Sequence, residues 1–207
     1  PNIKVYTDSL GTEQAFKQAA TESPIVHIAT HGFFFPNPEE VKQVLDAATE
    51  YGEVDFRGGS PTFGMDNFVN NLNPLMRSGL VFANVNDYWS GYSEVITDDG
   101  VLTALEVINI DLRNNQLVVM SACETGLGDI AGSEGVYGLQ RAFKMAGSSY
   151  LIMSLWQVPD SETAEFMEYF YTELTRNKSL NEAFSSAQRA MRQKYDPYYW
   201  AAFVLVE

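Results

Sequence analysis

The chain alternates short apolar runs with longer segments in which apolar residues recur at helical spacing. An apolar run without a polar face is typical of a strand that is covered on both sides. Such runs lie at residues 25–29, 80–83, 117–120, 150–153 and 202–206, and a weaker strand candidate lies at 3–7. Because helical patterns separate most of these runs, the sequence predicts an α/β fold with a mostly parallel sheet between helices.

The helical segments carry recognisable start and stop signals. Apolar stripes predict helices over residues 12–20, 133–146 and 161–175, and another that begins after Ser179. The pairs Thr103 with Glu106 and Ser179 with Glu182 match capping boxes, Asn37-Pro38 matches a helix start, and Gly147 matches a left-handed helix stop. Residues 53–73 lose the pattern and predict a long loop or a small hairpin.

The polar residues that follow two of the predicted strands are candidates for chemistry. Cys123, the only cysteine, comes just after the run 117–120, and His31 comes just after the run 25–29. In open α/β sheets ligands bind at the carboxyl ends of the strands. The second histidine, His27, lies in mid-strand and is interpreted as a hydrogen-bonded core residue. With one cysteine and two histidines, we expect no metal site and no cofactor.

A thiol and an imidazole at neighbouring strand ends can perform acyl transfer. Cys123 would attack a peptide carbonyl as the thiolate, and His31 would protonate the leaving amine. The backbone N–H groups of Gly32 and Cys123 are the candidate oxyanion donors. A lone cysteine in an apolar setting is also often an inert core residue, so composition alone leaves both interpretations open.

The net charge of -14 argues against a nucleic-acid partner, because proteins that bind phosphate backbones gather Lys and Arg on one face. Solubility is the simpler explanation of such a charge. No run approaches the length of a membrane helix, and the first residues lack the features of a signal peptide. We therefore expect a cytoplasmic protein that does not bind membranes.

Several motifs together resemble the CHAT domain, a caspase-like family found beside tetratricopeptide repeats. They are ATHG at 29–32, NPLMRSGLVFAN at 73–84, DDGVLTALEV at 98–107, SACETGLG at 121–128, EGVYGLQRAF at 134–143, MSLWQVPD at 153–160 and YYWAAFVLVE at 198–207. The resemblance implies a caspase-hemoglobinase-like three-layer α/β/α sandwich in which His31 and Cys123 match the catalytic pair. It also implies one domain over residues 1–207, with an insertion at about 37–73, that belongs to a longer protein with a tetratricopeptide-repeat region. We further expect that the insertion covers the cleft or presents a docking surface.

One position departs from the pattern of related metacaspases. They place an acidic residue two positions before the cysteine, where it reads a basic substrate residue, whereas this chain has Ser121. Asp160, which resembles an acidic residue of separases, is our first candidate for reading Arg or Lys, and helix capping is its alternative role. Asp129 is a second candidate, with a solvated turn residue as the alternative. Trp156 is a candidate wall of the substrate pocket, or a buried core residue.

The leading hypothesis is a cysteine endopeptidase that cleaves a protein substrate after a basic residue. A catalytically silent scaffold of the same fold that binds a partner protein is the alternative. A third interpretation, in which the glycine-rich stretch after Cys123 cradles a nucleotide phosphate, is weak because both the GxGxxG spacing and a Walker lysine are missing.

Overall fold

The computed structural model describes residues 3–35, 37–39, 68, 70–85, 98–121 and 133–207, with residues 133–137 described by their backbone. The part before the central strand contains η1 (Asp8–Leu10), α1 (Glu13–Glu22), β1 (Ile25–Ile28), β2 (His31–Phe34), η2 (Pro74–Met76), β3 (Ser78–Val81), β4 (Val101–Thr103) and α5 (Ala104–Ile108). The rest contains β5 (Leu117–Met120), α6 (Ser133–Ala146), β6 (Tyr150–Ser154), α7 (Asp160–Thr175), α8 (Leu180–Arg192), α9 (Pro197–Trp200) and β7 (Phe203–Val206).

The main sheet has the order β1-β5-β6-β7. Strand β5 pairs in parallel with β1 on one side and β6 on the other, while β7 runs antiparallel to β6. All four residues of β5 are buried, which explains its unbroken apolar run. The predicted α/β class with a mostly parallel sheet is therefore confirmed.

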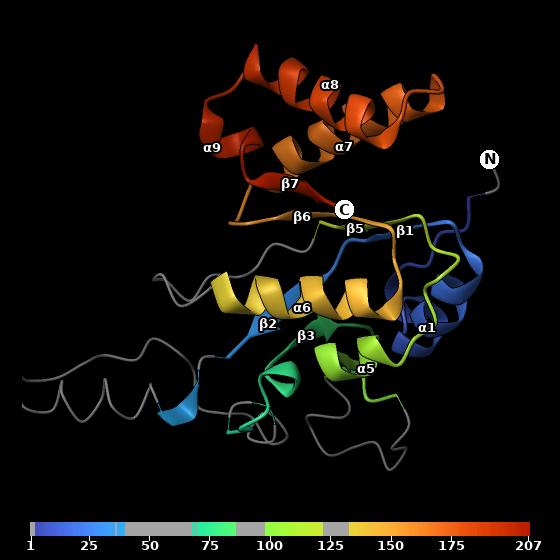
Figure 1. Cartoon of the computed structure of the whole chain (residues 1–207), viewed down its shortest axis with the longest axis vertical. Coiled ribbons are helices and arrows are strands. Elements are labelled where there is room, and N and C mark those ends of the chain that lie inside the picture. Colours follow the sequence, from blue (N-terminus) through green and yellow to red (C-terminus); the bar gives the residue numbers. More distant parts are fainter. Residues whose placement is uncertain (1–2, 36, 40–67, 69, 86–97, 122–132) are drawn as a thin grey trace, which may run out of the picture.

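Helices cover both faces of this sheet, so the molecule has three layers (Figure 1). Val118 and Met120 of β5 point toward α1, α5 and α6 and join a core that includes Phe143. Leu117 and Val119 point to the opposite face and join a second core beneath α7 and α8 that includes Phe166. The alternation of side chains along one strand thus builds both cores.

A second, smaller sheet has the antiparallel order β2-β3-β4. We expected the strand at 25–29 to end in Thr30-His31-Gly32, whereas His31 starts β2. The pairing of Phe33 with Gly79 of β3 explains the difference, because a Cβ atom at Gly79 would lie 2.8 Å from the Phe33 ring. This contact between distant residues leaves no periodic signal in the sequence.

Local signals predicted element ends well. Both capping boxes are present, at Thr103 and at Ser179, and Gly147 has a φ of 109° after α6. The strand predicted at 3–7 is wrong: Ile3 and Val5 are 76% and 73% exposed and pair with no described strand. The segment 37–73 lies mostly outside the described residues, although the Asn37 side chain accepts a hydrogen bond from the N–H of Glu39, as a cap would.

A buried carboxylate ties α1 to the region around β4. Glu13 is 1% exposed, and its Oε1 lies 2.5 Å from Lys17 Nζ while its Oε2 accepts a bond from Gly100 N at 3.1 Å. Lys17 also contacts Asp98 and Glu106, at 3.0 and 3.3 Å. Burial raises the pKa of Glu13 from its ordinary 4.5 to about 7, despite the opposing effect of Lys17.

This raised pKa gives a pH dependence of stability with a definite sign. Because folded Glu13 holds its proton to higher pH than unfolded Glu13, its contribution is complete below about pH 4.5 and is lost as pH rises through about 7. The free energy of unfolding should fall by up to about 1.4 kcal/mol per pH unit in this window. We expect Glu13→Gln to remove this slope in urea unfolding measured from pH 5 to 8. Glu168→Gln, an exposed control on α7, should keep it, and an unchanged slope in Glu13→Gln would contradict the assignment.

Candidate active site

The carboxyl ends of β1 and β5 lie side by side in the main sheet. Ile28 pairs with Met120, and the N–H of Ser121 donates to the Ile28 carbonyl at 3.0 Å. His31 and Cys123 each follow this last pair by three residues. Cys123 itself lies outside the described residues. The two segments that carry the predicted dyad therefore leave the sheet as direct neighbours.

His31 stands at the start of β2 with its side chain free. It is exposed and makes no hydrogen bond or ion pair with another described residue. The preceding residue is fixed, because the hydroxyl of Thr30 donates to the carbonyl of Val81, the residue that pairs with His31. An imidazole on an anchored backbone, with neither ring nitrogen bonded to a described residue, is suited to proton transfer.

Gly32 presents its backbone N–H away from the neighbouring strand. Phe35 N donates to Arg77 O, which is directly opposite it. In an antiparallel pair, hydrogen-bonded and non-bonded positions alternate, so Phe33 and His31 also bond to β3 whereas Gly32 does not. Its N–H consequently points away from β3. Gly32 is buried, and within the described residues its N–H is not used by the pairing with β3, so it is a candidate donor to a negatively charged oxygen.

His27 has a different environment, which sequence analysis predicted in part. Its Nε2 lies 2.9 Å from Ser121 Oγ and its Nδ1 lies 2.9 Å from the hydroxyl of Tyr171 on α7. Both ring nitrogens are thus hydrogen-bonded, as predicted, but the residue lies on the exposed edge strand and not in the core. Although His27 has solvent-accessible surface, the protein atoms around its ring partly desolvate it, which lowers its pKa; desolvation raises the pKa of Tyr171, so that its hydroxyl stays protonated.

Sequence analysis missed this Ser121–His27–Tyr171 chain. The contact between His27 and Ser121 could have been predicted from the alternation of side chains along paired strands. His27 pairs with Val119, and Ser121 lies two residues further along the chain, directly after β5, so its side chain is on the same face. Tyr171 carried no such signal, because the position of α7 over the sheet depends on tertiary packing. The chain of hydrogen bonds fixes the point at which β5 leads into the segment of Cys123.

Two of the predicted substrate-binding residues follow β6 at the same edge of the sheet. Met153 of β6 pairs with Met120, so Trp156 and Asp160 come after a third neighbouring strand end. Trp156 is 36% exposed and donates from Nε1 to Tyr198 O at 2.9 Å, which contradicts the core interpretation. Asp160 is exposed and is the first residue of α7, whose cap is Pro159, so the capping interpretation is wrong as well. Asp129 lies outside the described residues.

Comparison with known proteins places this arrangement in a family. The model of the CHAT domain matches residues 1–207. The chain belongs to the CHAT domain family. Tetratricopeptide repeat protein 28 from Homo sapiens is 26% identical over 206 residues, and the protein of the same name from Mus musculus is 27% identical over 204. Each alignment covers 96% of this CHAT domain and 8% of the relative, so the chain spans a small part of the relatives' length.

The described part of this CHAT domain contains no helix that is both long and apolar enough to span a bilayer. In the same residues no three His, Cys, Asp or Glu side chains gather in a way that could hold a metal ion.

Proposed function

We propose that this CHAT domain is a caspase-like cysteine endopeptidase that uses Cys123 and His31. The observation that carries the proposal is the pairing of Ile28 with Met120, because each catalytic candidate follows this pair at the same distance along the chain. The exposed side chain of His31, which bonds to no described residue, and the Gly32 N–H, which points away from β3, support the same assignment.

The chemistry follows from these positions. The thiolate of Cys123 attacks the carbonyl carbon of the scissile bond, and the N–H groups of Gly32 and Cys123 stabilise the oxyanion. When the C–N bond breaks, the proton of the His31 imidazolium passes to the leaving amine. Water then attacks the thioester, gives a proton to His31 and releases the acid together with the thiolate.

A peptide library read by mass spectrometry tests the proposal. The wild-type chain should cleave a defined subset of peptides, and Cys123→Ala should cleave none of them. A thiol-directed peptide probe should label Cys123. If neither cleavage nor labelling occurs, the scaffold that binds a partner protein replaces the peptidase as the function.

Asp160 supplies the prediction on specificity. Its exposed carboxylate lies after β6, where it could pair with an Arg or Lys side chain of the substrate. We expect Asp160→Asn to lower kcat/KM for an arginine peptide about 10-fold to 100-fold relative to the matching glutamine peptide, because a charged hydrogen bond is lost. Glu162→Gln, in the same helical turn, is the control. If Asp160→Asn lowered kcat/KM equally for the two peptides, another residue such as Asp129 would be the one that binds the basic side chain.

The partners of this domain are also part of the proposal. The matched relatives are named as tetratricopeptide repeat proteins and are far longer than this chain. We infer that a tetratricopeptide-repeat region accompanies this domain in a longer protein and that its substrate is a protein.

A further inference from the structure

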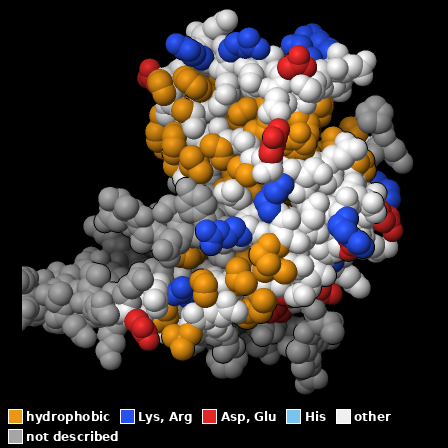
Figure 2. All heavy atoms as spheres, in the orientation of Figure 1, with side chains coloured by type: hydrophobic (Ala, Val, Ile, Leu, Met, Phe, Trp, Pro, Cys, Tyr) orange, Lys and Arg blue, Asp and Glu red, His pale blue; other side chains and the backbone are white. Residues whose placement is uncertain are grey.

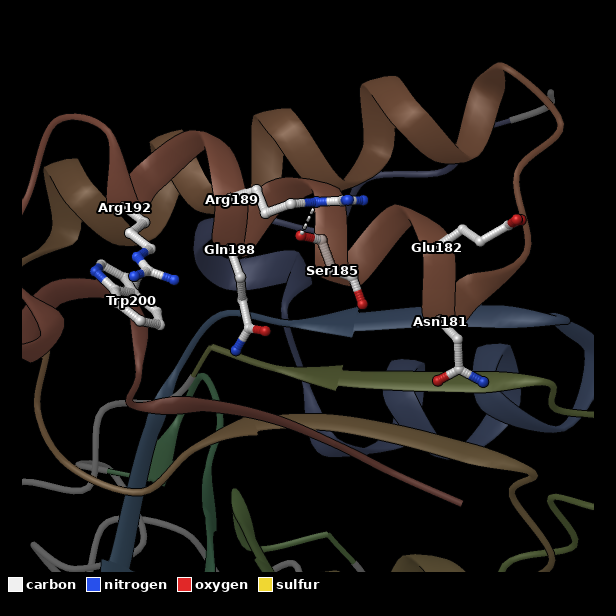
Figure 3. A pocket seen from close by; sticks show the side chains of 7 residues that line it. All are labelled: Asn181, Glu182, Ser185, Gln188, Arg189, Arg192 and Trp200. Carbon is white, nitrogen blue, oxygen red and sulfur yellow. Dashed lines mark hydrogen bonds between the residues drawn. The ribbon is translucent and has the colours of Figure 1, made fainter.

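A groove lies along α8, beside its buried stripe of Ala183, Phe184, Ala187 and Met191. Its volume is about 530 Å³, within the range of ligand-binding clefts. Asn181, Glu182, Ser185, Gln188, Arg189 and Arg192 line it from α8, and Trp200 closes one end (Figure 3). These residues are distinct from the candidate active site at the ends of β1, β5 and β6.

The groove borders the free edge of the main sheet. Gln188 Nε2 donates to Phe203 O at 3.4 Å, and Asn181 Nδ2 donates to Glu207 Oε1 at 3.0 Å, so α8 contacts both ends of β7. Leu155 N donates to Ala202 O, which makes Ala202, Val204 and Val206 the positions bonded to β6. Leu205 therefore directs its N–H and C=O away from β6. It lies between Phe203 and Glu207, the residues that Gln188 and Asn181 of α8 contact.

The groove carries two arginines in a chain whose net charge is -14: Arg192 lies beside Trp200, and Arg189 turns its side chain toward Ser185 (Figure 3). Arg189 donates to Ser185 O and Ser186 Oγ of its own helix, at 3.2 and 3.3 Å, and forms no salt bridge with a described carboxylate. Arg192 is exposed and also lacks such a salt bridge within the described residues. Lys and Arg side chains are prominent at the top of Figure 2, over the layer that contains α8.

The carboxylates near the groove are already engaged. Glu182 Oε2 accepts bonds from the N–H and hydroxyl of Ser179 in the capping box, and Glu207 accepts from Asn181. They also lie toward the start of α8, away from Arg192. Arg192 and the remaining N–H groups of Arg189 are therefore not paired with a described carboxylate and can bind carboxylates from outside this domain.

We infer that this groove binds an extended acidic peptide, which adds a strand to the free edge of β7 and places two carboxylates on Arg189 and Arg192. This inference does not depend on the proposed peptidase activity. The edge backbone of Leu205 supplies pairing, as in other proteins that bind a peptide by adding a strand. The arginines supply the selectivity for charge.

The spacing of the arginines specifies the peptide further. Residues three apart on a helix have Cβ atoms about 5–6 Å apart. In an extended strand, side chains on one face recur every second residue, about 6.6–6.8 Å apart. Two acidic residues separated by one other residue therefore match the helix positions of Arg189 and Arg192 once the Arg189 side chain leaves Ser185 and Ser186, while the intervening side chain points to the opposite face.

Fluorescence anisotropy with a labelled peptide of sequence Ser-Val-Asp-Val-Asp-Val-Ser tests this inference on the intact chain. We expect saturable binding that weakens with added salt. Replacing both aspartates by asparagine should raise Kd at least 10-fold, and so should N-methylation of the central valine, which removes a backbone donor. These peptide changes leave the protein unaltered, so a folding defect cannot explain them.

Variants of the chain locate the site. The double variant Arg189→Gln/Arg192→Gln should raise Kd at least 10-fold. Arg113→Gln, which removes an exposed charge that pairs with Asp111 outside the groove, should change Kd less than 2-fold. No binding at 1 mM peptide, equal binding of the asparagine peptide, or an equal loss in Arg113→Gln would overturn the inference. Self-association that the double variant abolishes would also overturn it, since a second copy of the chain would then occupy the groove.

Discussion

Replacing His31 with alanine is expected to lower kcat for peptide cleavage by about 10³-fold to 10⁴-fold while leaving the domain folded. The loss follows because His31 is the proposed general base and acid, and general acid–base catalysis by a positioned imidazole contributes up to about 10⁴-fold. Stability should change little, since the exposed His31 side chain makes no hydrogen bond with a described residue. Single-turnover kinetics together with thermal unfolding would measure both effects.

The other histidine provides the matched control for His31. His27→Ala removes hydrogen bonds to Ser121 and Tyr171, so it should cost about 1–3 kcal/mol of unfolding free energy. Its effect on kcat should stay within a few-fold. If His27→Ala abolished cleavage and His31→Ala did not, the catalytic assignment would pass to the Ser121–His27–Tyr171 chain.

Replacing Phe166 with alanine is expected to destabilise the domain by about 3–5 kcal/mol. Phe166 is fully buried, and its ring stacks on Phe203 with centroids 4.2 Å apart while meeting the edge of Phe184 at 5.6 Å. One side chain thus joins α7, α8 and β7. The loss is a large part of the stability of a typical domain, about 5–15 kcal/mol.

Urea unfolding would show this loss as a lower midpoint with an unchanged slope. Met145→Ala on α6 removes a side chain that is 68% exposed, and it should change the free energy of unfolding by less than about 0.5 kcal/mol. A loss below 1 kcal/mol in Phe166→Ala would mean that the layer of α7 and α8 contributes little to the cooperative core.

The sequence predicted features that depend on neighbouring residues. The apolar run of β5 indicated burial on both faces, and the pairs Thr103–Glu106 and Ser179–Glu182 located helix starts, because each signal lies within one turn or one strand. The strand expected at 3–7 failed because the alternation there matches no pairing partner. The start of β2 at His31 and the contact of Tyr171 with His27 depend on distant residues, and no local pattern encodes such contacts.

The candidate site shows the same division. The sequence placed His31 and Cys123 after apolar runs, and the order of strands in the sheet then made the two runs neighbours. Trp156 and Asp160 had local alternative roles, as a core residue and a helix cap, that only the packing of α7 and α9 could decide.

The position of β1 has a consequence for how the protein folds during synthesis. Its partner in the sheet is β5, so Ile25 cannot pair until the ribosome has synthesised Leu117. At about 5–20 residues per second, the ribosome needs roughly 5–20 s to make the intervening chain. Throughout that interval the apolar residues of β1 lack their native neighbours, which makes the nascent chain a substrate for chaperones. Variants that slow translation between these strands should therefore lower the soluble yield without altering the stability of the finished domain.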